Sequence, residues 1–152
     1  MAEVFLEIKG LPEVKERFEK LQRSFFARSV MTEIGNYILF SIKKRTSEGF
    51  DYKGQPFTPY SPGYKLFRDK TGHPSEGVNL TYTGSMLASM TYKPEASEVT
   101  VYFMNTKDSK GVENPKKAFF NNEEREFFKL SSSEIRKITD IIEDYFRRVI
   151  NG

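Results

Sequence analysis

Aromatic and basic side chains are interleaved between Arg45 and Lys70, in a segment without a regular hydrophobic period. The aromatic candidates for a contact site are Phe50, Tyr52, Phe57, Tyr60, Tyr64 and Phe67. The candidates for a basic strip are Lys43, Lys44, Arg45, Lys53, Lys65, Arg68 and Lys70. Aromatic rings stack on bases while Lys and Arg neutralise phosphates, and the same rings supply rigid contact area in protein interfaces.

A protein contact is the favoured interpretation of these rings. The acidic residues Glu48, Asp51 and Asp69 intrude into the segment, so its positive charge is modest for a phosphate-binding surface. Two alternatives stay open. One is a single-stranded nucleic-acid binding module that uses the rings as stacking platforms, and the other is an arm whose rings fold back onto their own domain.

His73 is the only histidine, and the chain has no cysteine. A two-histidine metal site, a thiolate zinc site and a cysteine nucleophile are therefore excluded. Asp69, Ser75 and Glu76 could join His73 in a Ser/His pair or in the metal site of a nuclease. A polar loop histidine is the favoured interpretation, because one flexible loop rarely preorganises a catalytic site. We expect no catalytic, metal or cofactor-binding residue and no enzymatic activity.

Charge is distributed unevenly along the chain. Overall, 24 basic residues against 21 acidic ones leave a net charge of only +3. Residues 43–72 contain seven basic and three acidic residues, whereas residues 121–144 contain seven acidic and four basic ones. A basic middle and an acidic end would let copies associate head to tail, or would orient the chain between two unlike partners. Ordinary solvated charged faces are the alternative.

The length of 152 residues fits a single domain, 1–152, that can bury a hydrophobic core. The first ten residues lack a basic region and a long apolar run, and no uninterrupted apolar run in the chain is longer than that from Tyr37 to Phe40. We therefore expect no signal peptide, no membrane-spanning segment and no membrane partner. The absence of cysteine fits a reducing cytoplasm.

Regular elements are predicted on both sides of the aromatic segment. Alternating apolar residues predict a strand from Val4 to Ile8. Apolar stripes predict helices from Leu11 to Phe25 and from Val30 to about Ser47, as one bent helix or a helical hairpin. Residues 86–92 and 99–104 predict a β-hairpin, whose first part could instead begin with one helical turn.

The C-terminal region predicts the clearest helix. Ser131 and Glu134 have the spacing of a capping box, in which each residue bonds a backbone amide near the other. An apolar stripe follows from Ile135 to Val149. We expect an amphipathic helix that closes the domain.

Residues 49–79 are predicted to form an extended aromatic and basic arm. Gly and Pro recur through its first part, which argues against a helix or a central strand there. Residues 105–117 are polar and expected to be mobile, and no internal repeat is apparent. The resulting fold class is α+β: a small antiparallel sheet with long N-terminal helices and a C-terminal amphipathic helix, plus a long irregular arm.

The order of four sequence pieces resembles the virion morphogenesis family of tailed bacteriophages, the tail-completion proteins of Mu-like and related contractile-tailed phages. The pieces are the helix running into Lys44–Thr46, DYKGQPFTPYS at 51–61 with Lys65 and Lys70 after it, LTYTGSMLASM at 80–90, and REFFKLS at 125–131 before the last helix. They cover most of the chain from about Ile34 to Ile150. The segment 105–117 matches the family poorly, and the first strand and helix match only in type.

The resemblance implies a non-enzymatic structural protein that acts in tail completion or head–tail joining as a homo-oligomeric ring. Its implied partners are copies of itself and neighbouring connector or tail proteins, with non-specific contact to DNA in the lumen through the basic strip. The implied location is the bacterial host cytoplasm during assembly and the virion neck or tail afterwards. Single-stranded nucleic-acid binding by the arm remains the alternative function.

Overall fold

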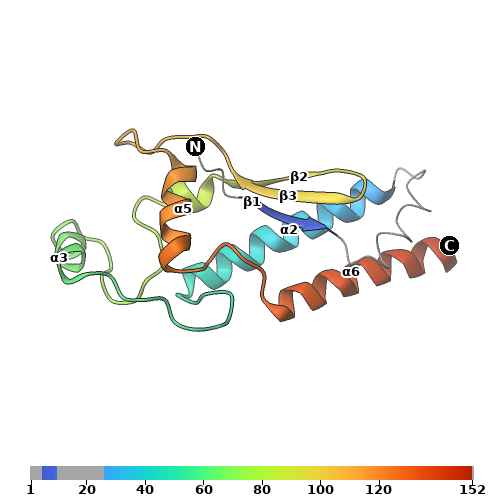
Figure 1. The fold of residues 1–152 in the computed structure, drawn as a ribbon, viewed down its shortest axis with the longest axis horizontal. Helices are drawn as coiled ribbons and strands as arrows, with labels where there is room; N and C mark the ends of the chain where they lie inside the picture. Colours follow the sequence, from blue (N-terminus) through green and yellow to red (C-terminus); the bar gives the residue numbers. More distant parts are fainter. Residues whose placement is uncertain (1–4, 10–25, 152) are drawn as a thin grey trace.

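The computed structural model describes residues 5–9 and 26–151 (Figure 1). The predicted helix from Leu11 to Phe25 lies outside these residues. The strands are β1 (Phe5–Lys9), β2 (Met90–Pro94) and β3 (Glu98–Phe103). The helices are α2 (Phe26–Ser47), α3 (Pro62–Lys70), α4 (Ser85–Ala88), α5 (Asn114–Glu124) and α6 (Ser132–Asn151).

The described strands form an antiparallel sheet in the order β1-β3-β2. Met90 pairs with Phe103 and Pro94 with Val99, so β2 and β3 form the predicted hairpin. β1 joins the other edge of β3, with Phe5 opposite Tyr102. Along β3 the side chains of Val99, Val101 and Phe103 are buried and alternate with half-buried residues, as expected for a strand with one face on a core. The α+β fold class is confirmed.

Helix α2 lies between the sheet and α6 (Figure 1) and contacts β2, β3 and α6. Its buried stripe contains Val30, Ile34, Ile38 and Ile42. At Gly35 the Tyr92 ring of β2 lies so close that a Cβ atom would be 2.2 Å from it. The Tyr92 hydroxyl also donates to Asn36 Oδ1 at 2.9 Å. A helix residue without a side chain therefore lets the sheet approach closely.

Helix α6 begins with the predicted capping box. Ser131 Oγ accepts from the Glu134 amide at 3.1 Å, and the Glu134 carboxylate accepts from the Ser131 amide at 2.7 Å. The buried apolar residues of α6 are Ile138, Ile141, Ile142, Tyr145 and Phe146, whereas Ile135 of the predicted stripe is exposed. The apolar face that packs on α2 therefore begins at the second turn.

The arm is not irregular throughout, because α3 occupies residues 62–70. The expectation that Gly and Pro exclude a helix there is wrong for a positional reason. Pro62 stands in the first turn, where a missing amide hydrogen costs no helical hydrogen bond, and Ser61 caps the helix by accepting from the Tyr64 amide at 3.3 Å. The earlier prolines, Pro56 and Pro59, precede the helix.

The segment 105–117, predicted to be polar and mobile, contains regular structure. The Asp108 carboxylate and backbone organise a tight turn at 108–112, and α5 begins at Asn114. The one-turn helix α4 confirms the alternative considered for Met86 and Leu87, so strand β2 begins only at Met90. Short polar segments and single helical turns carry too little periodicity to be assigned from sequence.

Candidate interaction surface on the arm

Helix α3 lies at one end of the elongated molecule, and the C-terminus of α6 lies at the opposite end (Figure 1). Residues 48–61 lead from α2 to α3, and residues 71–84 lead back to α4. The arm thus projects beyond the sheet and the two long helices. Its exposed apolar side chains on α3 are Tyr64, Leu66 and Phe67, of which Leu66 is 56% exposed.

Aromatic rings form a stacked column along the arm. Tyr64 stacks on Phe67 with 6.0 Å between centroids, Phe67 on Tyr82 with 5.7 Å, and Tyr82 on His73 with 3.9 Å. Tyr60 meets Tyr64 edge to face at 5.0 Å. Because the stacked rings pack against one another, the column holds α3 in place on residues 71–84.

Arg68 is the buried centre of the arm. Its side chain is 1% exposed, and its guanidinium lies 4.9 Å from the Tyr60 ring centroid. Nε donates to the carbonyl oxygen of Pro74 at 2.5 Å, and Nη2 donates to that of Thr81 at 2.9 Å. This predicted member of the basic strip therefore joins α3 to the return connection, in place of a regular hydrogen-bond ladder.

Arg125, at the end of α5, fastens the other half of the arm. Its Nε and Nη2 donate to the carbonyl oxygens of Thr58 and Pro59 at 2.9 and 3.3 Å, and its Nη1 donates to Glu124 at 2.6 Å. The guanidinium lies 5.4 Å from the Tyr60 ring centroid. The sequence did not indicate this role for Arg125, because a single Arg beside acidic residues is typical of a solvated surface.

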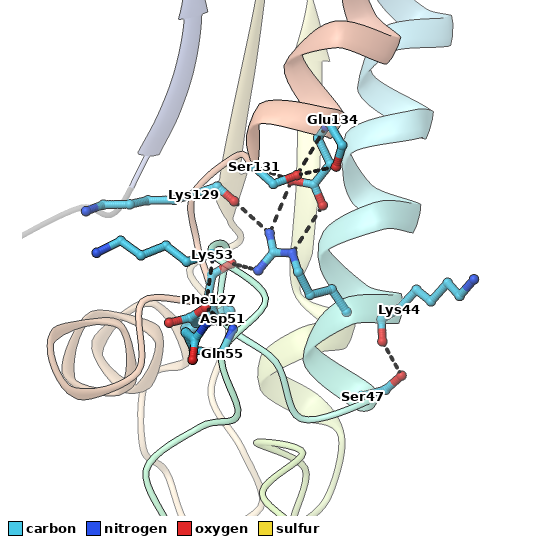
Figure 2. A network of polar contacts seen from close by, with 11 residues as sticks. Lys44, Ser47, Asp51, Lys53, Gln55, Phe127, Lys129, Ser131 and Glu134 are labelled. Carbon is cyan, nitrogen blue, oxygen red and sulfur yellow. Dashed lines mark hydrogen bonds and ion pairs between the residues drawn. The ribbon is translucent and has the colours of Figure 1, made fainter.

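Arg45 joins α2 to the start of α6. Its Nε donates to Glu134 at 3.1 Å, and its other nitrogens donate to the carbonyl oxygens of Phe127 and Lys129 at 3.2 and 2.7 Å. Figure 2 shows Phe127, Lys129, Ser131 and Glu134 gathered at this junction. The Glu134 carboxylate therefore serves both the helix cap and an ion pair, so Arg45 has a structural role.

Two turns share the pattern Asp-x-Lys-Gly-x, at residues 51–55 and 108–112. In each turn the Asp Oδ1 accepts from the amides two and four residues later, at 2.8 Å in the first and 2.9 Å in the second. The glycines have φ values of +76° and +78°. A search for short repeats would have found this pair, because the side-chain bonds demand Asp and the left-handed backbone favours Gly.

The two turns hold their lysines differently. Lys110 of the second turn lies over the Phe67 and Tyr82 rings, 5.5 and 5.6 Å from their centroids. Lys53 of the first turn lies over Tyr52 at 5.3 Å, and Lys129 lies over the same ring at 5.0 Å. Only the second turn brings its lysine to the aromatic column.

The six rings predicted as a contact surface differ in burial and fall into three groups. Phe57 and Tyr60 are buried in the core of the chain itself, so the alternative of rings folded back applies to these two. Tyr52 is half-buried, with its amide donating to the Glu126 carbonyl oxygen at 3.2 Å. Phe50, Tyr64 and Phe67 remain exposed. Only the last two share the end of the arm.

The predicted basic residues do not form one strip. Lys43, Lys44 and Arg45 belong to the end of α2, whereas Lys65, Arg68 and Lys70 belong to α3. Lys65 forms an ion pair with Glu76 at 3.6 Å, and partial burial lowers the pKa of Lys43. Lys44, Lys53 and Lys70 are exposed. The positive charge on the arm surface is therefore scattered.

A cleft of about 500 Å³ lies between the arm and α5. One wall contains Tyr60, Tyr64, Phe67 and Tyr82, and the other contains the 108–110 part of the second turn with residues of α5. Asp108 and Lys117 form an ion pair within the second wall. The hydrogen bond from Lys117, together with the amides of Val112 and Lys110, holds the pKa of Asp108 below its ordinary value. The cleft is thus bounded by one aromatic and one charged wall.

His73 Nδ1 lies 3.2 Å from Thr71 Oγ1, and its ring stacks on Tyr82. Within residues 5–9 and 26–151, no group of three or more His, Cys, Asp or Glu residues is placed to hold a metal ion. In the same residues, no helix has the length and apolar character needed to cross a membrane.

Comparison with protein-family models, curated proteins and solved structures found no significant match to this chain.

Proposed function

We propose that this chain is a structural protein of a phage or prophage virion that acts in tail completion or head–tail joining. It assembles with copies of itself into a ring and contacts neighbouring connector or tail proteins, in the host cytoplasm first and in the virion neck or tail afterwards. The order of the four sequence pieces motivates the family. The projecting α3, with Tyr64, Leu66 and Phe67 exposed on a braced arm, supports a role in protein contact.

Several features favour protein contact over single-stranded nucleic-acid binding. Base stacking needs free ring faces, and the faces of Phe67 and Tyr82 are engaged by neighbouring rings and by Lys110. Arg68 of the proposed basic strip is buried on backbone carbonyls. Exposed apolar side chains on a rigid helix are typical of a protein interface.

The test is Leu66→Glu, introduced into the phage or prophage that encodes the chain. Leu66 is exposed, so the charge leaves the fold intact while it disfavours an apolar contact. We expect the infectious titre to fall by at least tenfold, with unjoined heads and tails in electron micrographs. The matched control is Phe40→Glu on α2, 65% exposed and outside the arm, which should retain the titre. A normal titre for Leu66→Glu would contradict the arm as the contact element.

A salt titration with a ten-nucleotide oligothymidine tests the alternative function. Phosphate contacts require affinity to fall steeply as salt rises. We expect no saturable binding at physiological salt. Tight, strongly salt-dependent binding would favour the nucleic-acid module.

A further inference from the structure

The cleft between the arm and α5 has an unbalanced charge. Four basic and two acidic side chains line it. Both acids are already paired, Asp108 with Lys117 and Glu124 with Arg125. Arg68 and Lys110 have no ion-pair partner in the part of the chain that the structure describes. The described residues therefore leave two positive charges at one cleft without a counter-charge.

The Arg68 guanidinium is buried but incompletely bonded. Nε and Nη2 donate to carbonyl oxygens, whereas Nη1 makes no hydrogen bond with any described residue. The Tyr60 hydroxyl on the same wall is also buried without a hydrogen-bond partner among these residues, in a side chain only 7% exposed. A buried hydroxyl without a hydrogen-bond partner, and a cation that is 1% exposed and has no anion beside it among the described residues, are costly in a folded protein. An oxyanion bound in the cleft would relieve these costs.

Lys110 supplies the second positive charge from the opposite wall. The Asp108 turn sets its backbone, since the Lys110 amide donates to Asp108 Oδ1 at 2.9 Å. Its ammonium lies over the rings of Phe67 and Tyr82, which attract the cation without neutralising it. The charge therefore remains available to an incoming anion at the edge of the aromatic column.

We propose that this cleft receives a carboxylate side chain from an acidic segment of a partner protein. The inference deepens the proposed function, because it names the chemistry by which the arm would recognise a neighbour. A planar carboxylate suits a guanidinium, and the stem of a Glu or Asp side chain suits aromatic walls. A nucleic-acid backbone would need an open groove that follows successive phosphates, and the ring faces are engaged with one another.

The probe is a blocked peptide of alternating glutamate and leucine, compared with its glutamine–leucine counterpart by isothermal titration calorimetry on the full chain. We expect saturable one-to-one binding of the glutamate peptide and at least tenfold weaker binding of the glutamine peptide. Lys110→Gln should weaken glutamate-peptide binding about threefold to tenfold, by loss of an exposed charge pair. Lys53→Gln, at the same position of the other Asp-x-Lys-Gly-x turn, should leave binding unchanged.

Three outcomes would overturn the inference. The first is equal binding of the two peptides, and the second is equal weakening by Lys110→Gln and Lys53→Gln. The third is tighter binding of the ten-nucleotide oligothymidine that is lost in Lys110→Gln, which would assign the cleft to nucleic acid. Hydrogen exchange of the free variants checks that both fold. The Leu66→Glu assembly test is independent: the cleft can fail while the arm is still required for virions, and the arm can prove dispensable while the cleft binds the peptide.

Discussion

The arm and the body of this protein, the body being the sheet with helices α2 and α6, are stabilised by different interactions. In the body, α2 packs on the sheet and on α6 through aliphatic side chains such as Ile38 and Ile142, and regular hydrogen bonds satisfy the backbone. In the arm, two buried arginines donate to the carbonyl oxygens of irregular segments, and rings stack around them. Apolar burial in the body is spread over many residues, whereas the arm buries a few side chains such as Phe57 and Tyr60 and relies besides on directional contacts.

This difference suggests that the arm and the body open separately. Segments with few apolar contacts and locally satisfied backbones open with less free energy than the core. Removing one arginine contact should therefore loosen the arm while α2 and α6 stay folded. Substitutions in each region test whether the arm and the body open separately.

The largest effect is expected for Ile38→Ala in the body. Ile38 is fully buried on α2, so its truncation should lower the free energy of unfolding by about 2–5 kcal/mol through lost burial and a residual cavity. Chemical denaturation followed by circular dichroism measures the change. The control is Phe40→Ala on the exposed side of the same helix, which should change the free energy by less than about 0.5 kcal/mol. Equal losses would mean that α2 does not bury the face that carries Ile38.

A smaller, local effect is expected for Arg68→Met in the arm. Methionine retains the apolar stem but leaves the carbonyl oxygens of Pro74 and Thr81 without their donor, a loss of about 1–3 kcal/mol. Hydrogen exchange followed by mass spectrometry should show faster exchange in residues 62–83, with α2 and α6 unchanged. Lys70→Met, an exposed substitution on the same helix, is the control. Faster exchange throughout α2 and α6 would break the comparison, because arm and body would then unfold as one unit.

The smallest effect concerns pH and the Asp108 turn. The hydrogen bond from Lys117 lowers the pKa of Asp108 most, and backbone amides lower it further. The carboxylate therefore stabilises the folded turn at pH values above its unfolded pKa of about 3.9. This stabilisation is lost as pH falls through the lower folded pKa. NMR shifts of the Lys110 and Val112 amides should follow a transition below the ordinary Asp value, which Asp108→Asn removes. A midpoint at or above the ordinary value would show that Lys117 does not pair with Asp108 in solution.

Long periodic segments were predictable, and short polar ones were not. The α6 helix with its capping box, the hairpin and the α2 stripe follow from apolar spacing and from local side-chain bonds. Ser61 and Pro62 are typical of a helix start and indicated α3, but the many Gly and Pro residues around them favoured the prediction of an irregular arm. The helix α5 has no strong apolar face, so its pattern resembled a loop.

The candidate site divides in the same way. The sequence indicated that rings and cations gather in one segment, and the structure distributes them between the core, the surface and the cleft. Tyr82, Lys110 and Arg125 lie outside that segment and could not be assigned to it, because they reach the arm only through the fold. The repeated Asp-x-Lys-Gly-x pattern was visible in the sequence but gained meaning from its position.

The α+β class, the amphipathic last helix and the chemical character of the arm follow from the amino-acid sequence, because local periodicity, capping and composition act over a few residues. Which of the charged side chains are left without an ion-pair partner depends on the tertiary structure. Arg45 and Arg68 look alike in the sequence, yet one completes a helix junction and the other lines a cleft with no counter-ion among residues 5–9 and 26–151. That distinction depends on which distant carbonyls and carboxylates the folded chain brings within hydrogen-bond range, and local sequence does not specify those distances.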